Sequence, residues 1–186
     1  LRGTGRGHVV VSVSGGTRLI KGNDVVARAV ALMRDEGIDV ELRVYGRRYS
    51  ENPQLDRLVE SCGSYRGQLP KDAFFAELEE ADVFVMDSRH ESFGLSAVDA
   101  LAAGCSLLIS ANCGVREILG VESCDLVTDC EDAREVADKI SYLVENPNND
   151  RLCRSIDFED CGWTAAATRL REVCLHALEK KVESGK

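Results

Sequence analysis

The sequence predicts a doubly wound α/β fold built on a mostly parallel sheet of about six strands. Runs of β-branched and apolar residues alternate with stretches of helical periodicity along the chain. Two of these runs, Val83–Met86 and residues 107–109, are apolar on both faces, as central strands of a parallel sheet must be. Parallel strands also need crossover helices between them, and the alternation supplies these helices.

The first expected strand, residues 8–14, is a β-branched run that stops at Gly15-Gly16. A helix is expected next, over residues 23–36, with Asn23 or Asp24 as its N-cap. The remaining expected strands cover residues 40–45, 64–67, 82–86, 106–110 and 125–128. The remaining expected helices cover residues 54–61, 71–80, a segment from about Leu95 that closes at Ala103-Gly104, 131–144 and 163–181, with a break at 146–148 and a frayed tail at 183–186.

The length and composition are those of one domain. The 186 residues contain 44% hydrophobic residues, enough to bury one core of ordinary size, so we expect residues 1–186 to form a single domain. The sequence opens at Leu1 without a methionine, and we expect it to be part of a longer protein.

The net charge and the cysteine spacing weigh against nucleic acid, lipid and metal ions as partners. The formal charge of −9 repels phosphate backbones and anionic membranes, which weighs against nucleic acid or lipid as the main partner. None of the eight cysteines is spaced C-x-x-C, so we expect reduced thiols and no metal. Because no apolar run reaches the length of about 20 residues that spans a bilayer and no signal-like amino terminus is present, a cytoplasmic location is expected.

The segment after residues 82–86 carries the chemistry. A helix expected to begin just past the carboxyl end of a strand presents its free amides and its positive dipole to the crevice, which suits an anion. Gly94 permits close approach of a ligand to the backbone. Glu91 precedes this helix and Asp99 lies in its second turn, so both carboxylates can face one cavity and accept hydrogen bonds from vicinal sugar hydroxyls. Taken without further context, two such acids are more often a residue that caps backbone amides and a solvated helix residue, because most surface acids have no special role.

Glu91-Ser92-Phe93-Gly94-Leu95, followed by Asp99-Ala100 and Ala102-Ala103-Gly104, resembles the signature of family 4 retaining glycosyltransferases. The resemblance continues in the family's order through Gly15-Gly16 with Lys21-Gly22, Tyr65-Arg66-Gly67, residues 112–118 and Trp163. It covers nearly the whole chain. It corresponds to the carboxy-terminal domain of the two-domain GT-B fold, a Rossmann-like half that binds the nucleotide-sugar donor.

The resemblance implies a role for each matching residue. Glu91 would hold hydroxyls of the donor sugar, and Lys21 would neutralise the departing diphosphate without a metal, so these two are the catalytic candidates. The same likeness implies donor contacts from Arg18 and from the amides of Phe93, Gly94 and Leu95, a ribose contact from Asp99, and a nucleobase pocket at Gly67, Gln68 and Leu69.

Two positions depart from the family pattern. The family has glutamate where this chain has Asp99, which keeps the charge and loses about one methylene of reach, so the ribose contact would need a small shift or a water. It also has arginine where this chain has Gly16; Arg18 could substitute from the same loop, or the diphosphate clamp would be weaker. Arg47 and Arg48 could contact the phosphate or the base of the donor, or they could be solvated. Residues 67–69 could equally form a simple turn. His90 is a poor candidate for a general base.

The expected function is transfer of a glycosyl unit from a UDP-, GDP- or ADP-sugar to an acceptor hydroxyl, with retention at the anomeric carbon. The acceptor site would lie on an amino-terminal domain of the full-length enzyme, which would also make any peripheral membrane contact, and this chain alone would be inactive. Two other functions stay open: a glycosyltransferase-like domain that binds nucleotide or acts as a scaffold without catalysis, and half of a nucleotide-sugar 2-epimerase.

Overall fold

The computed structural model describes residues 7–48, 53–157, 159 and 161–184, and it is built on a sheet of six parallel strands. These are β1 (Val9–Val13), β2 (Val40–Tyr45), β3 (Gly63–Gly67), β4 (Val83–Met86), β5 (Ser106–Ser110) and β6 (Leu126–Val127). Their order in the sheet is β3-β2-β1-β4-β5-β6, and each neighbouring pair is parallel. The predicted doubly wound α/β fold is confirmed.

The direction in which the sheet grows reverses at β1. Val11 of β1 pairs with Leu42 of β2 on one side and with Val83 of β4 on the other. The chain first builds outward from β1 to β3, then returns and builds outward in the other direction from β4 to β6. The connections after β1 and β4 leave toward opposite faces of the sheet. In such sheets the ligand-binding crevice lies at the carboxyl ends of the two strands where this reversal occurs.

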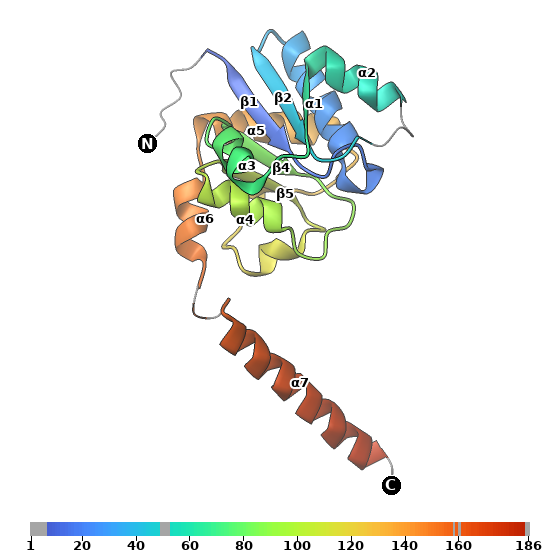
Figure 1. Ribbon diagram of the computed structural model, residues 1–186, viewed down its shortest axis with the longest axis vertical. Coiled ribbons are helices and arrows are strands. Elements are labelled where there is room, and N and C mark those ends of the chain that lie inside the picture. The colour runs from blue at the N-terminus through green and yellow to red at the C-terminus, as the bar shows by residue number, and fades with distance from the viewer. Residues whose placement is uncertain (1–6, 49–52, 158, 160, 185–186) are drawn as a thin grey trace.

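Helices cover both faces of the sheet (Figure 1). They are α1 (Asn23–Asp35), α2 (Pro53–Cys62), α3 (Lys71–Leu78), α4 (Leu95–Ala102), α5 (Ala133–Glu145), α6 (Asn149–Ser155) and α7 (Trp163–Ser184), with short 3-10 turns η1 (Leu19–Lys21), η2 (Gly114–Glu117) and η3 (Ser123–Asp125). One buried cluster joins α1, α2 and α5 to the sheet, and a second joins α3, α4 and α6 to its other face.

The alternation of side chains along β1 explains why both layers are needed. Val11 and Val13 are fully buried in the cluster under α1 and α5, whereas Val10 belongs to the cluster under α4. Burial of such a side chain contributes about 1.5–3 kcal/mol. A strand that is apolar on both faces therefore gains its full stabilisation only between two helical layers.

Helix α6 is absent from the sequence-based prediction, which placed only a break at residues 146–148. The helix has seven residues and only Leu152 is buried on it, so its periodic signal is weak. Its position is fixed by Asn148, whose buried amide bonds the backbone N and O of Leu107, each at 2.8 Å. This exchange continues the hydrogen bonding at β5 beyond the short strand β6.

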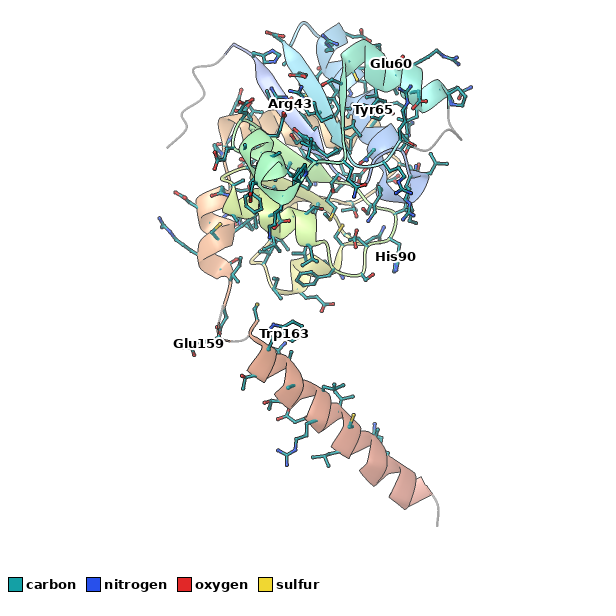
Figure 2. The ribbon with its side chains drawn as sticks, viewed as in Figure 1. Arg43, Glu60, Tyr65, His90, Glu159 and Trp163 are labelled. Atoms are coloured by element: carbon teal, nitrogen blue, oxygen red, sulfur yellow. The ribbon has the colours of Figure 1, made fainter. Side chains whose placement is uncertain are left out.

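Helix α7 confirms the prediction of a long last helix, but the large apolar side chains that the structure describes on it are exposed. It extends away from the sheet in Figure 1, and Figure 2 shows Trp163 at its start apart from the strands. Trp163 is 93% exposed, and Leu170 and Val173 are each 66% exposed. The helix includes Glu183 and Ser184, and residues 185 and 186 lie outside the described residues, so the fraying expected at 183–186 stays a prediction.

Candidate functional site

Two loops meet at the crevice between β1 and β4. The loop after β1 holds Gly15-Gly16 and η1, and the loop after β4 leads to α4. Ser14, at the end of β1, and Ser96, in the first turn of α4, share a hydrogen bond of 2.8 Å between their hydroxyl oxygens, although they are 82 positions apart in the sequence. The glycine loop and the start of α4 therefore lie next to each other.

Lys21 and Glu91 form an ion pair across this crevice, with Nζ donating to Oε2. The stem of Lys21 lies over Gly15, where an added Cβ would stand 2.7 Å from Lys21 Cγ. The side chains are 27% and 16% exposed, so the pair is partly shielded from solvent. The structure thus brings together the two residues expected to serve the diphosphate and the sugar.

Backbone hydrogen bonds fix the loop that carries Glu91. The Glu91 N–H donates to the carbonyl of Asn112 at 3.2 Å, and the Glu91 carbonyl accepts from the N–H of Gly114 at 3.0 Å. Val115 N donates to the carbonyl of Phe93 at 2.7 Å. Residues 112–118, included in the sequence resemblance without a stated role, therefore hold the Glu91 loop in place through backbone hydrogen bonds.

The first turn of α4 faces the crevice without a side-chain cap. Its N-cap is Gly94, which has φ 108 and would place an added Cβ 2.7 Å from Met86 Sδ, so a larger residue would disturb both backbone and packing. Phe93 is 37% exposed and Leu95 is 72% exposed. An uncapped, accessible helix start offers backbone amides to an anion.

Asp99 lies in the second turn of α4 and is paired toward α3. Its Oδ1 is 3.9 Å from Nζ of Lys71, and the two side chains are 32% and 74% exposed. A pair this exposed contributes about 0–1 kcal/mol and breaks easily. Its proposed contact with a ribose stays a prediction.

Gly16 is held by the loop that follows β2. It has φ 63, and an added Cβ would stand 1.9 Å from the carbonyl oxygen of Arg47. The Gly16 N–H donates to the carbonyl of Tyr45 at 2.8 Å. No side chain fits at this position without movement of the backbone. Arg18 is exposed at the start of η1.

The turn expected to bind a nucleobase is joined to the same loops. Gly46 N donates to the carbonyl of Gly67 at 2.7 Å, which ties the ends of β2 and β3, and Gln68 is exposed beyond it. Arg48 is bound to α2 through Asp56 at 3.1 Å and Glu60 at 2.9 Å, and its guanidinium carbon lies 4.9 Å from the centre of the Tyr65 ring. Arg48 is therefore a paired residue and not a free phosphate contact.

Asn23 and Asp24 were expected to cap α1, and this prediction is wrong. The N-cap is Gly22, and no side chain caps it. The amide of Asn23 instead donates to the carbonyls of Ser14 at 2.9 Å and Gly16 at 2.7 Å, which fixes the glycine loop. Asp24 accepts from both Nη atoms of Arg89, at 2.9 and 3.0 Å. A cap motif does not distinguish a side chain that folds back on its own helix from one that bonds a neighbouring loop.

Arg89 and Asp87, just before Glu91, are functional candidates that the sequence analysis missed. The hydrogen bonds that Arg89 donates to Asp24 and Glu131 raise the pKa of Arg89. Asp87 is fully buried, and both of its carboxylate oxygens lack a hydrogen-bond partner among the residues that the structure describes. Burial raises the pKa of Asp87 to about 8, against a lowering effect of Arg89. An acid directly after an apolar strand is the one sequence signal that points to Asp87. His90, by contrast, is exposed at the edge of the domain (Figure 2).

The described part of the chain offers neither a metal site nor a membrane-spanning helix. No group of three or more His, Cys, Asp or Glu side chains there could hold a metal ion. None of the helices described is long and apolar enough to cross a bilayer.

The chain is similar to proteins of known class. The model of the family "Glycosyl transferases group 1" matches residues 6–156. D-inositol 3-phosphate glycosyltransferase of Corynebacterium aurimucosum is 26% identical over 93% of this chain and 44% of its own length, and that of Thermobispora bispora is 28% identical over 76% and 40%. The chain therefore spans less than half of the length of these curated relatives.

Solved structures share the fold. The catalytic domain of cholesterol-α-glucosyltransferase from Helicobacter pylori is 19% identical, with a TM-score of 0.65 over 77% of this chain and 91% of that one. Anabaena HepE, solved in complex with UDP and glucose, is 20% identical, with a TM-score of 0.63 over 77% of this chain and 40% of that one. With the family model covering most of the sequence and the parallel sheet matching these structures, the chain belongs to the glycosyl transferases group 1 family.

Proposed function

We propose that this chain is the donor-binding domain of a retaining glycosyltransferase that uses a nucleotide diphosphate sugar. The observation that carries this proposal is the Lys21–Glu91 pair beside the uncapped start of α4. A cation and a set of helix amides suit a diphosphate, and a carboxylate suits the vicinal hydroxyls of a sugar. A nucleotide sugar carries these two chemical groups next to each other.

Each part of the site has a task in the transfer. The amides of Phe93 to Leu95 and the Lys21 ammonium bind the diphosphate and stabilise the charge that develops when it leaves. Glu91 holds the sugar by its hydroxyls, so that the anomeric carbon stays in place while the bond to the diphosphate lengthens. Attack of the acceptor hydroxyl on the same face as the leaving group then retains the configuration at the anomeric carbon. In this proposal the diphosphate leaves without the help of a metal. Asp99 and residues 67–69 orient the nucleoside.

The acceptor site belongs to another part of the protein in this proposal. In this proposal the chain is the carboxy-terminal domain and works against an amino-terminal partner domain. The chain spans 44% and 40% of the two curated relatives described above, so these proteins have length for a second domain. This chain alone is then expected to bind nucleotide weakly and to transfer no sugar. UDP is the first nucleotide to test, because HepE was solved with UDP and glucose.

One observation favours a second function, in which the domain binds nucleotide without catalysis. The contact of Gly16 with Arg47 leaves no space for a second cation at that position of the loop. Lys21 then provides the charge on the loop after β1 that directly faces Glu91. With one cation fewer, the departure of the diphosphate from the sugar is slowed more than the binding of the nucleotide is weakened. Activity of the full-length protein separates the two functions.

Calorimetric titration of the chain with UDP, GDP and ADP tests donor binding. We expect saturable binding of one nucleotide and a loss of about 10- to 100-fold in affinity for Lys21→Ala, because a charged hydrogen bond contributes about 1.5–3 kcal/mol. Lys180→Ala, on the exposed helix α7, is the matched control and should bind as the wild type does. Absence of saturable binding by all three nucleotides would contradict the proposal.

A further inference from the structure

The guanidinium of Arg89 has every N–H donor occupied. It has five such donors in a planar fork. Nη1 and Nη2 donate to Asp24 Oδ1 and Oδ2 at 2.9 and 3.0 Å. Nε and Nη2 donate to the two carboxylate oxygens of Glu131, and the second donor of Nη1 binds the carbonyl of Leu19. The side chain is 25% exposed, so these partners shield it from most of the solvent.

These contacts join the two loops of the candidate site. Arg89 binds η1 twice, because its own backbone N–H also donates to the carbonyl of Ile20, at 2.9 Å. Leu19 and Ile20 directly precede Lys21, and Arg89 stands two positions before Glu91. One side chain therefore connects the backbone next to the cation with the backbone next to the carboxylate. Asp24, at the start of α1, and Glu131, before α5, fix the orientation of the guanidinium through these hydrogen bonds.

We propose that Arg89 is a positioning residue that sets the distance between Lys21 and Glu91, so that one nucleotide sugar can bind both. The inference rests on the proposed donor binding. Arg89 acts through Lys21 and not by touching the ligand, since all its donors already have protein partners. Lysine at this position would keep the charge but not the fork, and η1 would lose its fixed place relative to the loop after β4.

A purely structural role is the competing explanation, and Arg151 provides the matched control. Its Nη2 donates to both oxygens of Asp125, at 2.7 and 2.6 Å, and its Nη1 donates to the carbonyl of Gly120 at 2.8 Å. It thus makes the same kind of contact, a paired carboxylate and a backbone carbonyl. Its partners lie in and before η3, near the β6 edge of the sheet, and not in the loops after β1 and β4.

A double-mutant cycle on nucleotide binding separates the two roles. UDP, GDP and ADP are titrated into the wild type, Arg89→Lys, Lys21→Ala and the double variant, with melting temperatures measured in parallel. If Arg89 acts through Lys21, Arg89→Lys alone weakens binding about tenfold, and adding Lys21→Ala costs less than about threefold further. In the Arg151→Lys background, Lys21→Ala keeps its full effect even though the melting temperature falls.

The outcomes are distinct. Additive losses from Arg89→Lys and Lys21→Ala, or equal coupling in the Arg151→Lys background, would overturn the positioning role while leaving donor binding intact. Failure of the wild type to bind any of the three nucleotides would overturn both. If Arg89→Lys does not fold, Asp24→Asn replaces it, because it loosens the guanidinium while keeping the side-chain size. Asp24→Asn must then show the same coupling with Lys21→Ala.

Discussion

The ion pair between Lys21 and Glu91 predicts that Glu91→Gln tightens the binding of a nucleoside diphosphate. Without a ligand, the ammonium is bound to the carboxylate, and a diphosphate has to displace it. The side chains are 27% and 16% exposed, between a surface pair, which contributes about 0–1 kcal/mol, and a buried one, whose disruption costs about 3–5 kcal/mol. We therefore assign the Lys21–Glu91 pair a free energy of about 1–2 kcal/mol. Its loss in Glu91→Gln corresponds to a gain of about five- to thirtyfold in affinity for the nucleoside diphosphate.

The assay is calorimetric titration of UDP and UDP-glucose into wild type and Glu91→Gln. UDP should bind more tightly to the variant, whereas the ratio of UDP-glucose to UDP affinity should fall, because the amide accepts sugar hydroxyls less strongly than the carboxylate does. Glu145→Gln makes the same charge change at the exposed end of α5 and should change neither quantity. UDP affinity that stays unchanged or falls in Glu91→Gln would refute the reasoning.

Three further predictions concern single positions in the site: Asp87, Gly16 and Asp99. The pKa of Asp87 is about 8 in the folded state against a usual value of 3.8, so its effect on stability is favourable below pH 3.8 and is lost as the pH rises toward 8. The stability gain from Asp87→Asn should therefore grow by up to about 4 kcal/mol between pH 5 and pH 8 in urea unfolding, and a gain independent of pH contradicts this. Gly16→Ala should cost more than about 1 kcal/mol and more than Gly37→Ala, because both glycines have positive φ but only Gly16 has a backbone atom in the way; equal thermal shifts for the two would be the wrong result. Asp99→Glu should tighten UDP binding about two- to fivefold by restoring reach to the ribose, and weaker binding in calorimetry would argue against a ribose contact.

The sheet could be predicted because its signal is local. Val83–Met86 and residues 107–109 are apolar on both faces, and only a strand between two layers buries such a run. Helix α6 gave no such signal, because seven residues with a single buried leucine carry little periodicity. Its position depends instead on the side-chain amide of Asn148, a contact with β5 that spans 41 positions.

The site could be predicted as a set of residues but not as a geometry. Lys21 and Glu91 were found separately, one from the glycine loop and one from the start of a helix. Their pairing depends on how β1 and β4 lie side by side, which fixes loops 70 positions apart. Asn23 shows the same limit, since its residue type fits a helix cap and its amide in fact binds the glycine loop.

Arg89 and Asp87 were missed because their importance comes from tertiary contacts alone. An arginine in a loop is usually solvated, and the sequence does not show that Asp24 and Glu131 converge on it. Asp87 follows an apolar strand, yet its burial depends on the approach of Gly22, where an added Cβ would stand 1.8 Å from the Asp87 carbonyl oxygen.

The central claim is that a diphosphate binds between the glycine loop and the first turn of α4, and amide chemical shifts test it most directly. In an NMR titration of the labelled chain with UDP, GDP and ADP, we expect large, saturable shifts for the amides of Gly15, Gly16 and Phe93 to Leu95. The amides of Arg134 and Glu135, which the Asp132 side chain caps at 2.8 and 3.2 Å, should not move. Shifts of equal size at both helix starts, or none at α4 at saturating nucleotide, would contradict the account.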